Sequence, residues 1–204
     1  MKKLFLASGS PRRHEILGVM GLPHEVATAP ADESIDETLT PKEVGEILAA
    51  RKALALKNKL ETEGRFTPDT LILAADTLVY LDGEALGKPK NEEEALEMLL
   101  SLSGRAHIVC TGTCLIHGGR SISASELSLV YMRDFTKEEA LSYIATGEPL
   151  DKAGAYGIQG KGSVLIDRIE GDFFSIMGLS PKTVWRLLNM LGIEYFSSLN
   201  DFSK

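Results

Sequence analysis

The chain has 204 residues, of which 44% are hydrophobic and 25% charged, and its formal net charge is −7. This length and apolar content suffice for one sizeable core, and no linker or internal repeat divides the sequence, so we expect a single domain over residues 1–204. The negative charge argues against a protein held on nucleic acid or on a membrane surface by general electrostatics.

The chain starts with a short apolar run, residues 3–7, that leads directly into a polar loop. A run this short is too brief for a helix, so we expect a buried strand there. Ser10 followed by Pro11 is typical of a helix start, because Ser is a good N-cap and Pro is tolerated at the first helical position. Gly9 is expected to allow a backbone bend that a Cβ would oppose. A helix should therefore begin at the end of the first strand.

The junction between this strand and helix predicts an anion site. Ser8, Arg12 and Arg13 bring a hydroxyl and two guanidinium groups to a helix N-terminus, where N–H donors and the helix dipole also favour negative charge. Guanidinium groups pair with phosphate oxygens in two parallel hydrogen bonds, so adjacent arginines suit a polyphosphate. The alternative is a solvated basic first turn without a ligand.

The N-terminal segment could also pass for a secretion signal, but polar and charged residues interrupt its apolar run early. No stretch approaches the roughly 20 apolar residues that cross a bilayer. We therefore expect a cytoplasmic protein without a membrane span.

A second strand is expected over residues 22–28, and the polar loop after it carries Asp32 and Glu33. The carboxylates belong either to a solvated surface loop or to a site, because α/β proteins place site residues where strands end.

The next helix should start with the capping box formed by Thr40 and Glu43 and run to about residue 59. Helical spacing places Arg51 within its apolar face and Lys52 at the margin of that face. Either these cations face a cleft or a partner, or their stems are buried while their charges reach water.

Residues 70–80 form the most apolar stretch and predict a central strand that contains one carboxylate, Asp76. Burying a lone acid is costly unless a cation, a metal or hydrogen bonds satisfy it, so a functional role for Asp76 is favoured over a structural one. Lys88 follows shortly, behind the flexible Gly87. The remaining pattern predicts a helix from residue 91 to about 104, a hairpin over 105–132 with its turn at 118–119, and a helix from 136 to about 147.

Two cysteines and two histidines at residues 107, 110, 114 and 117 resemble a metal-ligand pattern. On a strand, however, alternation puts the cysteines on one face and the histidines on the other. The cysteines would be roughly 13 Å apart, too far for a disulfide. We expect neither zinc nor a disulfide here.

Residues 151–162 form a glycine-rich loop that superficially suggests a P-loop. The pattern fails, because Ala155 stands where the first glycine should be and Gly162 where Ser or Thr should follow the lysine. A strand is expected over 163–166, and Pro181 opens a last helix whose Trp185 and leucines are expected in the core.

In this order, the motifs resemble the Maf family of nucleoside-triphosphate pyrophosphatases over nearly the whole chain. They lie at residues 7–13, 32–33, 48–53, 75–77, 87–89, 104–107 and 152–160. The resemblance implies an α/β fold with a mixed twisted sheet flanked by helices and two lobes around a deep cleft, as in the inosine-triphosphate pyrophosphatases. It also implies hydrolysis of a nucleoside triphosphate to a monophosphate and pyrophosphate, with nucleotide-pool cleaning and a link to septum formation.

The form of the motif around Gln159 is similar to the subgroup that acts on dTTP and UTP, with modified pyrimidine nucleotides as further candidates, rather than to the subgroup that prefers 7-methyl-GTP. The resemblance makes Asp76 the catalytic residue. It assigns substrate selectivity to Arg12, Thr77 and Gln159. It assigns phosphate or metal contacts to Ser8, Arg13, Glu33, Lys52 and Lys88.

The chemistry of the residues agrees with this assignment. The side chains that can offset the charge of a triphosphate are Arg12, Arg13, Lys52 and Lys88. Glu33 and Asp76 can hold a hard divalent cation, Mg²⁺, Mn²⁺ or Co²⁺. The ion would bridge phosphate oxygens and acidify the attacking water. Whether Asp76 acts as a base or as a metal ligand stays open at this point.

Two other functions compete with hydrolysis. A nucleotide sensor that regulates septum formation without turnover is the alternative, but a buried carboxylate would repel its ligand unless a metal were bound. RNA binding is disfavoured by the acidic charge and by the lack of aromatic residues among the basic ones. The expected partner is thus a nucleoside triphosphate, without nucleic acid or membrane, and with a homodimer as an option.

Overall fold

The computed structural model describes residues 2–36 and 38–199. The chain divides into two compact units. Unit 1 comprises Met1–Asp76, Thr111–Glu126 and Gly178–Lys204, and unit 2 comprises Thr77–Cys110 and Leu127–Met177.

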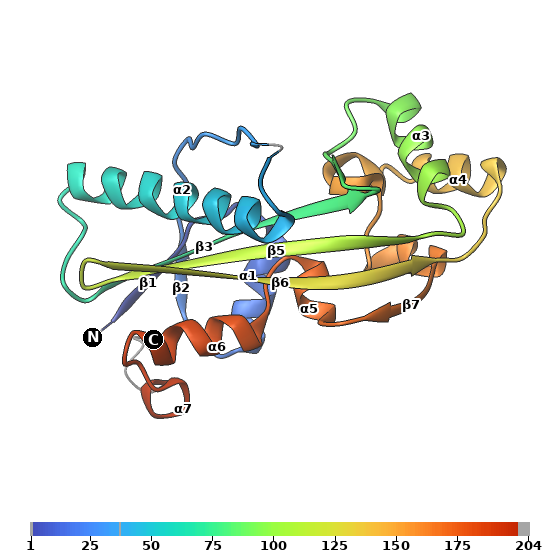
Figure 1. Ribbon diagram of the computed structural model, residues 1–204. Coiled ribbons are helices and arrows are strands. Elements are labelled where there is room, and N and C mark those ends of the chain that lie inside the picture. Colours follow the sequence, from blue (N-terminus) through green and yellow to red (C-terminus); the bar gives the residue numbers. More distant parts are fainter. Residues whose placement is uncertain (1, 37, 200–204) are drawn as a thin grey trace. The chain divides into compact units, whose positions relative to one another are not determined.

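The helices and strands follow one another as shown in Figure 1. Unit 1 contains β1 (Lys3–Leu6), α1 (Pro11–Val19), β2 (His24–Val26), α2 (Pro41–Thr62), α6 (Pro181–Met190) and α7 (Tyr195–Ser198). Unit 2 contains β4 (Glu84–Leu86), α3 (Glu92–Leu102), α4 (Lys137–Ile144), β7 (Ile166–Glu170), α5 (Phe173–Met177) and the 3₁₀ helices η1 (Glu148–Asp151), η2 (Ala153–Ala155) and η3 (Gly160–Leu165). Both units share β3 (Thr70–Leu81), β5 (Ala106–His117) and β6 (Arg120–Met132).

The strands form one mixed sheet in the order β2-β1-β3-β5-β6-β7, with β4 paired to β3. β1 runs parallel to β2 and to β3, whereas β4 is antiparallel to β3 and β7 is antiparallel to β6. The predicted α/β class with a mixed sheet and flanking helices is therefore confirmed.

In unit 1, α2 packs its small and aliphatic side chains on β1, β3 and β5. The helix begins at the predicted capping box, in which Thr40 and Glu43 satisfy each other's backbone N–H groups. It approaches the sheet closely, since a Cβ at Gly112 would lie 2.0 Å from the carbonyl oxygen of Gly45. This close approach fixes the position of α2, which carries Arg51 and Lys52.

In unit 2, α3 packs against α4. Both helices cover an apolar cluster that includes Leu99, Val109, Val130 and Ile144. The predicted hairpin is confirmed, because β5 and β6 are neighbours in the sheet and are joined by Gly118 and Gly119 alone. Both glycines have positive φ angles, 56° and 77°, as a two-residue hairpin turn requires.

Three expectations from the sequence are wrong. Residues 163–165 belong to η3 rather than to a strand, and β7 starts at Ile166. Trp185 is 45% exposed, because the neighbouring positions Val184 and Leu188 take the buried face of α6. The expectation that a Cβ would be opposed at Gly9 is also wrong, because a Cβ there would meet no atom within 4 Å.

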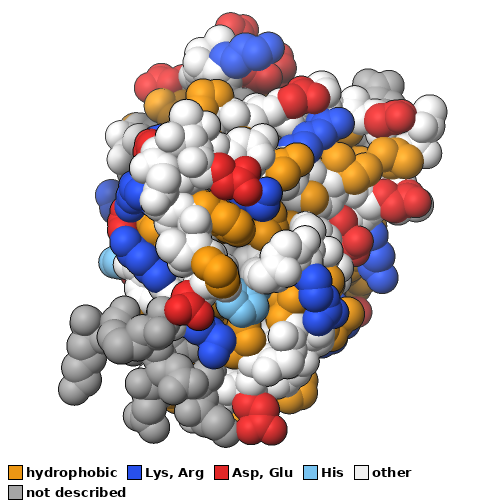
Figure 2. Space-filling model, turned by 90° about the vertical axis from the view of Figure 1, so that its left-hand side faces the viewer, with side chains coloured by type: hydrophobic (Ala, Val, Ile, Leu, Met, Phe, Trp, Pro, Cys, Tyr) orange, Lys and Arg blue, Asp and Glu red, His pale blue; other side chains and the backbone are white. Residues whose placement is uncertain are grey.

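The surface in Figure 2 mixes basic, acidic and apolar side chains over the face that is shown. Ion pairs bring some opposite charges together, such as Glu25 of β2 with both Lys3 and Arg65. Within residues 2–36 and 38–199, no helix is long and apolar enough to cross a membrane.

Candidate active site

The loop between β1 and α1 holds one arginine in a fixed position. The hydroxyl of Ser8, which is buried, accepts hydrogen bonds from the Ser10 backbone N–H (3.2 Å) and from Nη1 of Arg13 (2.9 Å). Nε of Arg13 donates to the carbonyl oxygen of Gly178 (2.8 Å). Ser10 occupies the N-cap position as expected, although its side chain makes no capping bond. The predicted anion site therefore contains an arginine that is oriented before any ligand binds.

The charge of Arg13 is linked to the central strand. Burial lowers the pKa of the Arg13 guanidinium, and the negative charge of Asp76 opposes that shift, while the neighbouring charge of Arg12 adds to it. A buried guanidinium stays protonated even so. The charges of Arg12 and Asp76 are therefore close enough to Arg13 to influence its protonation.

Lys52 joins two carboxylates that come from distant segments. Its Nζ lies 2.5 Å from Oδ1 of Asp76 on β3 and 2.8 Å from Oε1 of Glu33 in the loop after β2. The side chains of Lys52 and Asp76 are 20% and 16% exposed, whereas that of Glu33 is 68% exposed. The lone acid in the apolar strand is therefore satisfied by a cation from α2.

Arg51 holds the loop that carries Glu33. Its Nη1 donates to the carbonyl oxygen of Ser34 (2.7 Å) and lies 3.3 Å from Oδ2 of Asp32. Hydrogen bonds from the backbone and hydroxyl of Ser34 lower the pKa of Asp32, and the charge of Arg51 adds to this effect. Arg51 and Lys52 each pair with a carboxylate of this chain, Arg51 with Asp32 and Lys52 with Glu33 and Asp76. The sequence signal for Arg51 is its position within the apolar face of the helix, but no local pattern indicates its partners.

Glu33 and Asp76 are also a reasonable donor set for a divalent cation. Their oxygens converge on one point, which the Lys52 ammonium occupies. Among the described residues there is no group of three or more His, Cys, Asp or Glu side chains that could hold a metal. Two carboxylates nevertheless suit an ion such as Mg²⁺, which commonly completes its shell with water and phosphate oxygens. The two carboxylates are thus of the kind that the implied metal prefers, and Lys52 pairs with both of them in this structure.

The two cysteines of β5 are buried thiols, and each of its two histidines contacts an oxygen atom of another segment. Cys110 and Cys114 are free and buried. Nε2 of His107 lies 2.7 Å from the hydroxyl of Tyr156, and Nδ1 of His117 lies 3.1 Å from the carbonyl oxygen of Thr70. These contacts give each histidine a hydrogen-bonding role in the packing of its own unit.

Comparison with known proteins places the chain in a family. A family model described as Maf-like protein matches residues 3–191. The chain belongs to the Maf family. It is 45% identical over 196 residues to the dTTP/UTP pyrophosphatase of Caldicellulosiruptor bescii, which covers 95% of this chain and 97% of the relative. The dTTP/UTP pyrophosphatase of Caldicellulosiruptor saccharolyticus is 43% identical with the same coverage, and that of Bacillus cereus is 42% identical over 95% of this chain and 92% of the relative.

Most of the charged side chains assigned from the resemblance lie together in unit 1. Hydrogen bonds, ion pairs and charge interactions link Ser8, Arg13, Glu33, Lys52 and Asp76 there. Arg12 is next to Arg13, close enough for its charge to affect the pKa of that residue. The structure thus brings together six of the nine side chains assigned from the resemblance.

The other Maf positions, Thr77, Lys88 and Gln159, belong to unit 2. Thr77 follows Asp76 on β3, where successive side chains point to opposite faces of the sheet. Lys88 and Gln159 are exposed. A contact of these three residues with the nucleotide stays a prediction.

Proposed function

We propose that this Maf protein hydrolyses dTTP and UTP to the nucleoside monophosphate and pyrophosphate. The observation that carries the proposal is the similarity to proteins named dTTP/UTP pyrophosphatase, at 42–45% identity over 95% of the chain. The polar cluster of unit 1 supports it, since oriented cations beside carboxylates suit the binding and cleavage of a phosphate chain.

Arg13 and Lys52 are proposed to bind the phosphates. The contacts of Arg13 with Ser8 and Gly178 fix its guanidinium, so little conformational entropy is lost when a phosphate binds. An ammonium group has three N–H donors, and Glu33 and Asp76 take two of those of Lys52. In the metal-free protein, the third can donate to a phosphate oxygen.

Asp76 is proposed as the group that prepares the attacking water. Its carboxylate lies in the cluster with Lys52 and within the electrostatic reach of Arg13. A carboxylate there can accept the proton of a water that attacks the α-phosphorus. The same oxygens can instead bind the metal, so the proposal covers both roles.

Glu33 and Asp76 are proposed to hold Mg²⁺, Mn²⁺ or Co²⁺. When bound, such an ion offsets the charge of the phosphates and increases the acidity of water. Gln159 is proposed to select the base, because a carboxamide offers both a donor and an acceptor to a uracil or thymine edge. A cytoplasmic location, action on modified pyrimidine nucleotides, a homodimeric state and a link to septum formation belong to the same proposal.

The test is a substrate panel. The purified protein is incubated with UTP, dTTP, CTP, ATP and GTP in Mg²⁺ or Mn²⁺, and pyrophosphate and orthophosphate are quantified separately. We expect monophosphate and pyrophosphate, with UTP and dTTP as preferred substrates. Release of orthophosphate with a diphosphate would contradict the proposed bond cleavage. Binding of UTP without turnover would support the alternative function, a nucleotide sensor that regulates septum formation. The names of the relatives, dTTP/UTP pyrophosphatase, indicate turnover instead.

A further inference from the structure

The glycine-rich loop that contains Gln159 is held by one carboxylate and one phenol of unit 2. Glu148 accepts hydrogen bonds from the backbone N–H of Lys161 and of Gly162, each at 3.0 Å. The hydroxyl of Tyr143 donates to Oε1 of Glu148 (2.9 Å) and accepts from the backbone N–H of Gly157 (3.1 Å). The bound amides lie on both sides of Gln159 in the sequence, so this pair fixes the backbone that presents Gln159.

The close approach of this pair explains why the loop is rich in glycine. A Cβ at Gly160 would lie 2.8 Å from Oε2 of Glu148, and one at Gly162 would lie 2.5 Å from the Tyr143 hydroxyl. Gly160 also has a φ angle of +77°, which L side chains rarely adopt. Two of the glycines in this loop, Gly160 and Gly162, therefore make room for Glu148 and Tyr143.

The protonation of the pair agrees with these hydrogen bonds. Burial raises the pKa of the Glu148 carboxyl, but hydrogen bonds from Gly162, Lys161 and Tyr143 outweigh it and lower the pKa below its ordinary value. Burial and the hydrogen bond to Glu148 raise the pKa of the Tyr143 hydroxyl. At neutral pH, Glu148 is thus an anion that only accepts, and Tyr143 keeps the proton that it donates.

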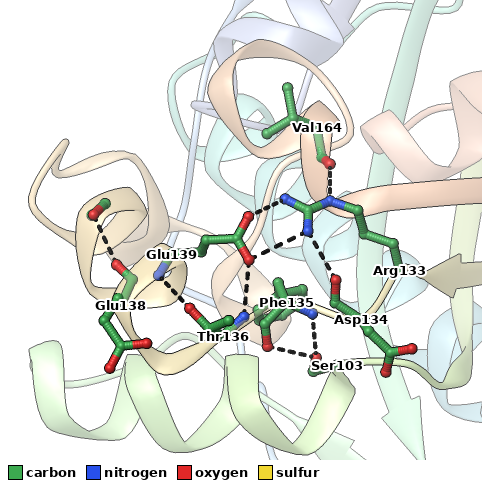
Figure 3. A network of polar contacts seen from close by, with 9 residues as sticks. Ser103, Arg133, Asp134, Phe135, Thr136, Glu138, Glu139 and Val164 are labelled. Atoms are coloured by element: carbon green, nitrogen blue, oxygen red, sulfur yellow. Dashed lines mark hydrogen bonds and ion pairs between the residues drawn. The ribbon is translucent and has the colours of Figure 1, made fainter.

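The far end of η3 is tied to the same helix, α4, that carries Tyr143 (Figure 3). Nε of Arg133 donates to the carbonyl oxygen of Val164 (2.8 Å), and its Nη2 donates to Oε1 of Glu139 (2.7 Å). Glu139 in turn forms the capping box of α4 with Thr136. The chain after Gln159 is therefore anchored both beside that residue and near the C-terminal end of η3.

We infer that Glu148 and Tyr143 are positioning residues for base selection, because they hold the backbone on both sides of Gln159 and so orient its carboxamide toward the base. Gln159 itself is exposed, and its side chain makes no capping bond to η3, although it occupies the N-cap position. The inference rests on the proposed function. It adds two residues that the resemblance does not assign to the site.

The experiment compares Glu148→Gln and Tyr143→Phe with the full-length parent protein. A glutamine at 148 places an NH₂ group against one of the amides, and phenylalanine at 143 removes the hydroxyl. The readout is kcat/KM for UTP divided by kcat/KM for ATP on the same preparation, because this ratio does not depend on the folded fraction. We expect Glu148→Gln to lower it about tenfold, mainly through a higher KM for UTP, and Tyr143→Phe to lower it less.

Two controls separate positioning from general damage. Glu97→Gln makes the same chemical change at an exposed position of α3 and should leave the ratio unchanged. In a Gln159→Ala background, Glu148→Gln should cause little further loss, because residues that act through one another are not additive. Amide exchange at Gly157, Lys161 and Gly162 should become faster in Glu148→Gln and stay unchanged in Glu97→Gln.

The outcomes distinguish the two proposals. If the parent protein hydrolyses no nucleoside triphosphate, the proposed function fails, and base selection by this loop fails with it. If the parent prefers UTP but Glu148→Gln and Tyr143→Phe keep its UTP to ATP ratio, the positioning role alone is overturned. Full additivity of Glu148→Gln and Gln159→Ala would also overturn it.

Discussion

Asp76→Asn separates the catalytic role of Asp76 from its role as the partner of Lys52. Asparagine keeps the shape of the side chain but removes its negative charge and its basicity. If Asp76 is the base or the metal ligand, the loss should fall on the chemical step, by roughly 10²–10⁴ in kcat. Nucleotide affinity without metal should be kept or increased, because a repulsion between the carboxylate and the phosphates disappears.

The effect on stability follows from the contacts of Lys52. Breaking one half of a fully buried ion pair costs about 3–5 kcal/mol, because the other charge is left without a partner. Here the Lys52 ammonium also lies 2.8 Å from Glu33, and the side chains of Lys52 and Asp76 are 20% and 16% exposed. We therefore expect a smaller loss, about 1–2 kcal/mol, which corresponds to a Tm lower by roughly 2–8 °C for a chain of this size.

The assay measures Tm, kcat and the Kd for UTP on one preparation of each protein. Asp82→Asn is the matched control, since Asp82 is 70% exposed and pairs with Arg105 at 2.7 Å. It should change Tm little and leave kcat at the parental value. An Asp76→Asn protein that melts much earlier than expected, yet turns over at the parental rate while folded, would refute the catalytic assignment.

Three further predictions concern the metal, the base and the buried histidine. EDTA should abolish hydrolysis and added Mg²⁺ or Mn²⁺ should restore it, because Glu33 and Asp76 are proposed to hold the ion; full turnover in chelator would contradict the metal role. Gln159→Ala should lower the preference for UTP over ATP by the equivalent of ~1–3 kcal/mol, measured as a ratio of kcat/KM values, and an unchanged preference would exclude Gln159 as the reader of the base. Burial lowers the pKa of His107 to about 4, so the unfolded chain, in which histidine has a pKa of about 6.5, binds a proton that the folded chain does not. The free energy of unfolding should therefore fall by about 3 kcal/mol from this residue as the pH drops from 6.5 toward 4. His107→Gln should flatten that dependence in denaturant titrations, whereas an equal slope in both proteins would show that His107 is not responsible.

Local signals in the sequence were enough for most of the elements. The capping box at Thr40 and Glu43, the start of α1 at Pro11 and the paired glycines of the β5–β6 turn act over a few residues, so they work the same way in any fold. Residues 163–165 were misassigned as a strand, because the amides just before them bind Glu148, which lies 13 and 14 residues away along the chain. The expectation for Trp185 is wrong because it rests on the hydrophobicity of the residue, whereas helical spacing puts Val184, Leu187 and Leu188 on the buried face and leaves Trp185 45% exposed.

In the candidate site too, some features follow from the sequence and others only from the tertiary structure. The sequence by itself determined which charged residues follow β1 and β2 and which lie on α2 and within β3. It also indicated that Asp76, a carboxylate in an apolar strand, needs a partner, but not which residue that partner is. Only the tertiary structure decided that this partner is Lys52, that Lys52 also meets Glu33, and that Arg51 holds the loop of Glu33. These contacts join residues 17 to 24 positions apart along the chain, and the contact of Arg13 with Gly178 spans 165 positions. Pairing over such separations depends on how α2 packs on the sheet, and no spacing rule within a single element contains that information.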